Sequence, residues 1–420
     1  MFNHNKQISN PSSAGDVGGN FETDIGKNKV KNRFGFIQLS DLQFGENHRF
    51  GNPSTIAEKL LSDIKKMSGE YDFTPLYIVL SGDITEKAHS EEFNGAANVI
   101  EEILNGVNID RTNILCVPGN HDVNWNLSEY SQEAGDDQLK FLPYNNFAST
   151  ITNSKDCSVR DCYPRIIDDQ LDLGLEFLLL NSCEKEDRSN HNGYVSLEKL
   201  KKTLPSQALK GDERLKIAIL HHRLDTSITD KRSAIENAPD IEAILACNKY
   251  NIVLTGHAHQ ALCHDVNNSD GHNIIFAGCG STGADYRQRE DGIQNQYCIH
   301  VIDLDANEFQ SIWRAYNPSL QTEYGLGGWT RDNSFNEEPR KFALPTIKRA
   351  GAISSQTMIN PALSTGNNIC SNSVTDNIAE KISEDIDIKP SVQEKTNWNN
   401  FKHAAKIAIA NLLGGWDENV

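Results

Sequence analysis

Residues 76–83 read LYIVLSGD, a short run of apolar residues that stops at a glycine and an aspartate. Residues 34–41 (FGFIQLSD) and 114–120 (ILCVPGN) follow the same plan, an apolar run that gives way at once to small and polar residues. Runs of this length and composition are typical of β-strands. Further runs of the same kind are LEFLLLNS at 175–182, KIAILHH at 216–222, NIVLTGH at 251–257, NIIFAG at 273–278 and YCIHVIDLD at 297–305.

Amphipathic helical segments separate several of these runs. They begin at Ser54, Ser90, Ser196 and Pro239, residue types that favour the first turn of a helix. Strands and helices in alternation predict a layered α/β domain. Because the strands are apolar almost throughout, both faces of their sheets must be covered, either by helices or by a second sheet.

Composition sets outer limits on the protein class. The chain has 420 residues, 38% of them hydrophobic, which is enough for one large domain with an appendage or for two modest domains. Its formal net charge of −18 argues against a non-specific grip on nucleic acid or on an anionic membrane, although a local basic groove stays compatible with it. Nine cysteines without a CxxC pair suggest a reducing compartment, and no segment reaches the length of a membrane span. We therefore expect a cytoplasmic protein without a membrane partner.

The chain divides by composition into four regions. They are a disordered leader at 1–32, a folded domain at 33–340, a polar linker at 341–397 and an amphipathic helix at 398–416. The apolar face of this helix consists of Trp398, Phe401, Ala405, Ala408, Leu412 and Trp416. Such a helix can pack on its own domain, dock on a protein partner or associate with a second copy. Within the folded domain, the polar stretches 123–172 and 184–195 could form a cap over the active face.

Metal-binding residue types stand at the carboxyl ends of five expected strands: Asp41, Asp83, Asn120, His221 and His257. Ligands of α/β sheets bind at this edge, where loops bring residues distant in sequence to a common point. Carboxylates, an amide oxygen and imidazoles together suit Mn²⁺, Fe²⁺ or Zn²⁺. Asp83 could bridge two such ions, with a bridging hydroxide as the nucleophile. Each residue alone is explained as well by a helix cap or a turn, but five in order favour a metal site.

Five sequence blocks also carry a family resemblance: SDLQFG, SGDITE, PGNHD, LHH and TGHAH. In this order they resemble the signature of calcineurin-like metallophosphoesterases, which reads DxH, GD, GNH(D/E), H and GHxH. The resemblance implies a four-layer α/β/β/α sandwich with two central mixed β-sheets. It also implies hydrolysis of a phosphate ester with two divalent metal ions. We expect Mn²⁺, with Fe²⁺, Zn²⁺ or Mg²⁺ as alternatives.

The resemblance assigns roles to individual positions. One metal would be held by Asp41, Gln43, Asp83 and His259, and the second by Asp83, Asn120, His221 and His257. His121 takes the position of the histidine that contacts the phosphate and protonates the leaving oxygen, and Glu86 and Asp122 complete the expected catalytic set. Gln43 departs from the usual histidine. Its amide oxygen is a harder and weaker donor, which should loosen the first metal and shift its preference toward Mn²⁺ or Mg²⁺.

Charged residues beside these blocks are candidate phosphate contacts. Glu86 and Lys87 stand where phosphoprotein phosphatases of the superfamily have Asp and Arg, so Glu86 could orient His121 and Lys87 could reach a phosphate oxygen. Arg223 is a further candidate, because a guanidinium matches phosphate bidentately. Among the other histidines, only His191 precedes a turn that could face the site.

The substrate class follows from the resemblance alone. The block spacing, the stretch HNGYVSLEKL at 191–200 and the GHAH ending resemble the cyclic-nucleotide phosphodiesterase and nuclease-like branches. We therefore expect a phosphodiester substrate, a nucleotide or a nucleic acid. A phosphomonoesterase acting on phosphoprotein or a small metabolite is the alternative within enzymes. A binding scaffold that has lost catalysis is the alternative outside them.

Overall fold

The computed structural model describes residues 32–46, 48, 50, 53–134, 136–153, 163–168, 174–206, 212–224, 235–267, 271–336 and 339–346. The leader up to residue 31, most of the expected linker and the whole expected helix at 398–416 lie outside the described residues. The last described strand, β13 (Arg340–Ala343), extends a few residues past the expected domain boundary at 340. Within these ranges, no helix is both long enough and apolar enough to cross a membrane.

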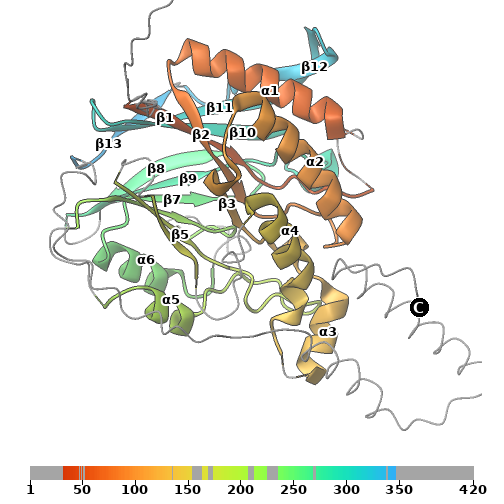
Figure 1. Ribbon diagram of the computed structural model, residues 1–420, viewed down its shortest axis with the longest axis vertical. Helices are drawn as coiled ribbons and strands as arrows, with labels where there is room; N and C mark the ends of the chain where they lie inside the picture. Colours follow the sequence, from red (N-terminus) through yellow and green to blue (C-terminus); the bar gives the residue numbers. More distant parts are fainter. Residues whose placement is uncertain are drawn as a thin grey trace, which may run out of the picture. The chain divides into compact units, whose positions relative to one another are not determined.

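Two mixed sheets form the centre of the fold (Figure 1). The first contains β1 (Arg33–Leu39), β2 (Thr74–Ser81), β3 (Ile114–Val117), β10 (Gln296–Asp303), β11 (Glu308–Thr322), β12 (Gly325–Arg331) and β13. Its order is β12-β11-β10-β1-β2-β3, and β13 pairs with β11. The strands β1, β2 and β3 run parallel, so the loops that follow them leave the same edge.

The second sheet repeats this arrangement. It contains β4 (Arg165–Asp168), β5 (Leu175–Leu179), β6 (Leu215–Ile219), β7 (Ile252–Thr255), β8 (Leu262–Asn267) and β9 (Asn273–Gly278). Its order is β4-β5-β6-β7-β9-β8, with β5, β6, β7 and β9 parallel and an antiparallel strand at each edge. The loops after β6 and β7 therefore also leave one common edge.

Helices cover the outer faces of both sheets. They are α1 (Pro53–Glu70), α2 (Ser90–Val107) and α4 (Leu142–Thr152) on the first sheet, and α5 (Leu197–Thr203) and α6 (Ala238–Cys247) on the second (Figure 1). Successive residues of β1 show the layering, because Ile37 packs toward α1 and α2 whereas Phe36 packs between the sheets. A third apolar layer, which includes Leu220 and Ile241, joins the second sheet to its helices. This is the four-layer α/β/β/α sandwich that the family resemblance implies.

Polar contacts fix the helices on this frame. The Glu92 carboxylate accepts the backbone N–H groups of Lys87 (2.9 Å) and His89 (3.1 Å), which caps α2 directly after the Asp83 loop. A buried ion pair joins α1 to β11, with Asp63 2.7 and 2.8 Å from Arg314. Both side chains are almost fully buried, and the Tyr297 hydroxyl also donates to Asp63 Oδ2 (2.7 Å), so the ion pair is part of a buried hydrogen-bonded network.

The polar stretch expected to cap the active face contains two helices. They are α3 (Trp125–Ala134) and α4, and α4 packs against α2 and β3 as part of the outer helical layer. Among the described residues of this stretch, those around the start of α3 come near the predicted catalytic residues, since Val123, Trp125 and His121 line the same cavity. The region therefore contributes to the fold as well as to the surroundings of the site.

Candidate metal centre

Left-handed backbone marks the loops that carry the predicted ligands. Five of the seven predicted ligand positions have positive φ: Asp41 (50°), Gln43 (45°), Asp83 (51°), His257 (67°) and His259 (54°). This conformation costs of order 1 kcal/mol or more for a residue with a side chain, and it persists only where surrounding structure enforces it. Hydrogen bonds between loops do so here, from the N–H of Asp41 to Gly82 O (3.0 Å) and from the N–H of Gln43 to Asp83 O (2.9 Å).

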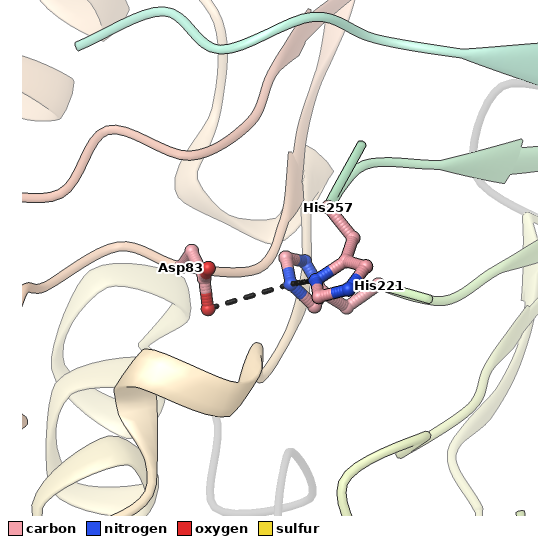
Figure 2. A group of neighbouring side chains, drawn as sticks. All are labelled: Asp83, His221 and His257. Atoms are coloured by element: carbon pink, nitrogen blue, oxygen red, sulfur yellow. Dashed lines mark hydrogen bonds and ion pairs between the residues drawn. The ribbon is translucent and has the colours of Figure 1, made fainter. Parts of the chain in front are cut away.

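Three of the predicted ligands of the second metal converge on one point (Figure 2). Asp83, His221 and His257 each offer a ligand atom within 4.8 Å of the others. The fourth, Asn120, places Oδ1 3.1 Å from His221 Nε2 and 3.1 Å from His257 Nδ1. His221 donates its Nδ1–H to the Ser81 carbonyl (2.8 Å), which leaves the Nε2 lone pair directed at the cluster. Such a hydrogen bond from the ring nitrogen that does not bind the metal is typical of metal-binding histidines.

The predicted ligands of the first metal form an adjoining group. Asp41, Asp83 and His259 also offer ligand atoms within 4.8 Å of one another, and His259 Nε2 lies 3.0 Å from Asp41 Oδ1. His259 Nδ1 is 2.6 Å from the Gln288 carbonyl, which again leaves Nε2 to face the cluster. Asp83 belongs to both groups, the position that a bridging carboxylate occupies.

Buried donor atoms without protein partners show that this donor set fits metal ions. Both amide atoms of Gln43 are buried and accept or donate no hydrogen bond among the described residues. A buried polar group without a partner costs about 1–3 kcal/mol, and a cation bound to the amide oxygen would offset part of that cost. Carboxylate, imidazole and amide donors together match divalent cations of intermediate hardness.

The electrostatic field of the cluster favours positive charge. Burial alone would lower the pKa of His221, but the Asp83 carboxylate outweighs it and raises that pKa to about 9. For His257, burial and the neighbouring His221 lower the pKa to about 4, so the two rings are not both positively charged near neutral pH. Burial opposes ionisation of Asp83, yet the surrounding histidines hold its pKa well below the usual range.

The sequence matches a known protein family. The sequence matches the model of the calcineurin-like phosphoesterases over residues 34–261, more than half of the chain. This chain belongs to the calcineurin-like phosphoesterase family. Membership makes it a hydrolase of phosphate esters that depends on a dinuclear divalent metal centre. No curated protein gives a significant match to the chain.

Solved structures give more distant likenesses. A dimetal phosphatase from Danio rerio is 14% identical and matches 71% of this chain and 98% of its own, with a TM-score of 0.44. Vacuolar protein sorting 29 from Cryptosporidium parvum is 11% identical and matches 74% and 98%, with a TM-score of 0.34. A predicted phosphoesterase from Streptococcus pneumoniae is 12% identical and matches 71% and 98%, with a TM-score of 0.28. These scores are too low to support an argument about substrate.

His121 of this phosphoesterase borders the ligand cluster. Its backbone N–H donates to Asp83 Oδ1 (2.8 Å), and its Nδ1 lies 2.9 Å from the Glu86 carbonyl oxygen. Burial would lower the pKa of His121, but the Asp83 carboxylate and the contact with Glu86 raise it above the ordinary value. Glu86 therefore meets the ring through its backbone, whereas the sequence suggested that its side chain would orient His121.

Asp122 links the loop after β2, which carries Asp83, to the loop after β3, which carries Asn120. Its carboxylate accepts hydrogen bonds from the backbone N–H groups of Ile84 (3.1 Å), Thr85 (2.9 Å) and Gly119 (3.0 Å) and from the Thr85 hydroxyl (2.9 Å). The side chain is fully buried. Burial and the charge of Asp83 raise its pKa to about 6 in spite of these donors. The geometry makes Asp122 a brace between the loops that carry Asp83 and Asn120.

The remaining sequence candidates lie around the cluster. Lys87 is half exposed, with Nζ 3.8 Å from the Glu46 carboxylate, and Arg223 donates from Nη2 to the Gln260 carbonyl (3.0 Å). His191 is exposed and pairs through Nδ1 with the Glu186 carboxylate at 2.6 Å. Glu186, Trp125 and the carbonyl groups of Ser81 and Gln288 did not emerge from the sequence. A backbone carbonyl leaves no signal in residue type, and an isolated Glu or Trp in a polar stretch gives little.

Proposed function

We propose that this protein hydrolyses phosphodiester bonds, with nucleotides or nucleic acids as substrates. The observation that carries the proposal is that Asp83 belongs to both groups of ligand atoms. One ion would be held by Asp41, Gln43, Asp83 and His259, and the other by Asp83, Asn120, His221 and His257. Bound there, the two ions activate a water molecule as the nucleophile and offset the charge of the phosphate group.

The chain itself would supply the proton for the leaving oxygen. His121 Nδ1 is occupied by the Glu86 carbonyl, so the proton for the leaving group would come from Nε2. The backbone hydrogen bond from His121 to Asp83 keeps this ring at the edge of the ligand cluster.

The preference for a diester over a monoester rests on the family resemblance. The block spacing, the stretch at 191–200 and the GHAH ending resemble the cyclic-nucleotide phosphodiesterase and nuclease-like branches.

The test compares bis(p-nitrophenyl) phosphate with p-nitrophenyl phosphate after chelation and return of Mn²⁺. We expect diester hydrolysis that needs added metal and that falls at least a hundredfold in Asp83→Asn. Asp291→Asn, a change to an exposed carboxylate, is the matched control and should leave the rate unchanged. A preference for the monoester would establish the phosphomonoesterase instead. Turnover that survives chelation or Asp83→Asn would refute the assignment of the metal centre.

A further inference from the structure

A cavity of about 230 Å³ opens beside His121. Its wall has contributions from the loop after β2, the loop after β3, the start of α3 and one residue further along the chain. The residues are Glu86, Lys87, His89, His121, Val123, Asn124, Trp125, Asn126 and Arg188. None of the predicted metal ligands lines it. The cavity therefore adjoins the ligand cluster on the side of His121, separate from the volume where the metal ions would lie.

The position of His121 identifies which part of a substrate this cavity would receive. A general acid must lie within hydrogen-bond reach of the oxygen that it protonates. If His121 protonates the leaving oxygen, the alcohol attached to that oxygen extends past the His121 ring and away from the metals. The cavity is the space available to it in that direction.

An exposed indole forms part of the cavity wall. Trp125 is 38% exposed, whereas Trp313 and Trp329 are 1% and 4% exposed. A large aromatic ring left open in a cavity next to a catalytic group is suited to stacking on a flat ligand, and nucleobases stack on such rings irrespective of sequence. Lys87 and Arg188 also line the cavity, each beside a carboxylate, Glu46 at 3.8 Å and Glu129 at 2.7 Å.

A buried acid holds the indole in place through a histidine. The His191 ring packs against Trp125 with centroids 5.3 Å apart, and His191 is not part of the cavity wall. Behind it, the fully buried Glu186 contacts His191 Nδ1 at 2.6 Å. The contact fixes the orientation of the imidazole, which in turn supports the indole. Glu186 and His191 are therefore positioning residues for Trp125.

We propose that this cavity binds the nucleoside portion of the leaving group, with its base stacked on Trp125. The inference rests on the proposed function, since it takes His121 as the proton donor to the leaving oxygen. It narrows the substrate class to phosphate esters whose leaving alcohol carries a nucleobase. Esters of simple alkyl alcohols or of phosphorylated side chains would leave the indole without a partner.

Adenosine is the probe for the test, because it is a leaving alcohol without a phosphate and cannot be turned over. We expect adenosine, but not ribose, to bind the full-length Mn²⁺-loaded protein in calorimetry and to inhibit bis(p-nitrophenyl) phosphate hydrolysis competitively. Trp125→Ala should weaken binding about tenfold or more, as expected for the loss of a base-stacking contact. Trp125→Leu keeps an apolar side chain without a ring and should show the same loss.

The matched control is Tyr324→Ala, an aromatic residue of similar exposure (41%) in the turn between β11 and β12 that does not line the cavity. It should bind adenosine as the wild type does. Equal adenosine affinity in Trp125→Leu and the wild type would overturn the inference, as would a wild-type protein that hydrolyses diesters but does not bind adenosine. Adenosine binding that depends on Trp125 in a protein without diester turnover would instead reject the proposed function and retain the nucleoside site.

Discussion

Removing the Asp122 carboxylate should mainly lower the free energy of unfolding, with a smaller direct effect on the hydrolysis step. In Asp122→Ala the buried N–H groups of Ile84, Thr85 and Gly119 lose their acceptor, while the Thr85 hydroxyl can still donate to the His121 carbonyl (3.2 Å). Each buried N–H without an acceptor costs about 1 kcal/mol or more, so the three together predict a loss of about 3–5 kcal/mol. That is a large share of the roughly 5–15 kcal/mol that stabilises a typical domain.

Urea unfolding with a chelator present measures this loss without a contribution from bound metal. The exposed Asp291→Ala is the control and should stay within about 0.5 kcal/mol of the wild type. The Asp122 carboxylate holds the loops of the predicted ligands Asp83 and Asn120, so its loss should weaken metal binding. Activity lost in Asp122→Ala should therefore recover in part at high Mn²⁺ concentration. A variant as stable as the wild type that stays inactive at saturating metal would refute this reasoning and place Asp122 in the reaction itself.

Three further changes test other parts of the structure. Gln43→His should fold, since histidine tolerates the φ of 45° at this position. It should lower the Mn²⁺ or Zn²⁺ concentration for half-maximal activity about tenfold, and unchanged metal dependence would count against Gln43 as a ligand. Asp63→Ala leaves Arg314 buried without its carboxylate and should cost about 3–5 kcal/mol in urea unfolding, and a loss under 1 kcal/mol would show that water reaches the pair. Burial raises the pKa of Glu186 from 4.5 to about 7, although His191 opposes the shift. The folded state therefore binds the Glu186 proton more tightly than the unfolded state does, and the free energy of unfolding falls as pH rises from about 4.5 to 7. The melting temperature of Glu186→Gln relative to the wild type should therefore rise between pH 5 and pH 8, and a constant difference would contradict the raised pKa.

Strands with a continuous apolar run were predictable from the sequence, and strands without one were not. The eight predicted apolar runs are β1, β2, β3, β5, β6, β7, β9 and β10. No such run occurs in β4, which reads RIID, or in β8 (LCHDVN), which ends in exposed residues. The first half of β11 is buried, but polar residues such as Gln310 and Arg314 interrupt its apolar pattern, and its second half is largely exposed. β12 reads GLGGWTR, where glycines weaken any strand signal.

The site shows a similar division. Side chains that act through their own atoms at strand ends, such as Asp83 and His257, could be found from residue type and order. Roles that depend on where the backbone or a buried neighbour lies could not. The sequence gives no sign that Glu86 meets His121 through its carbonyl, that Asp122 braces two loops, or that Glu186 supports Trp125 through His191.

The left-handed backbone of the ligand loops has a consequence for anyone who wants to redesign this centre. Alanine is the usual choice for deleting a side chain, but at Asp41, Asp83 or His259 it removes the donor and keeps the torsional cost of positive φ, because it retains a Cβ. Glycine would remove the donor and relax the backbone at once. Comparing alanine with glycine at each of these positions would thus separate metal affinity from loop geometry, and asparagine would be the next most compatible replacement wherever an oxygen is to be kept.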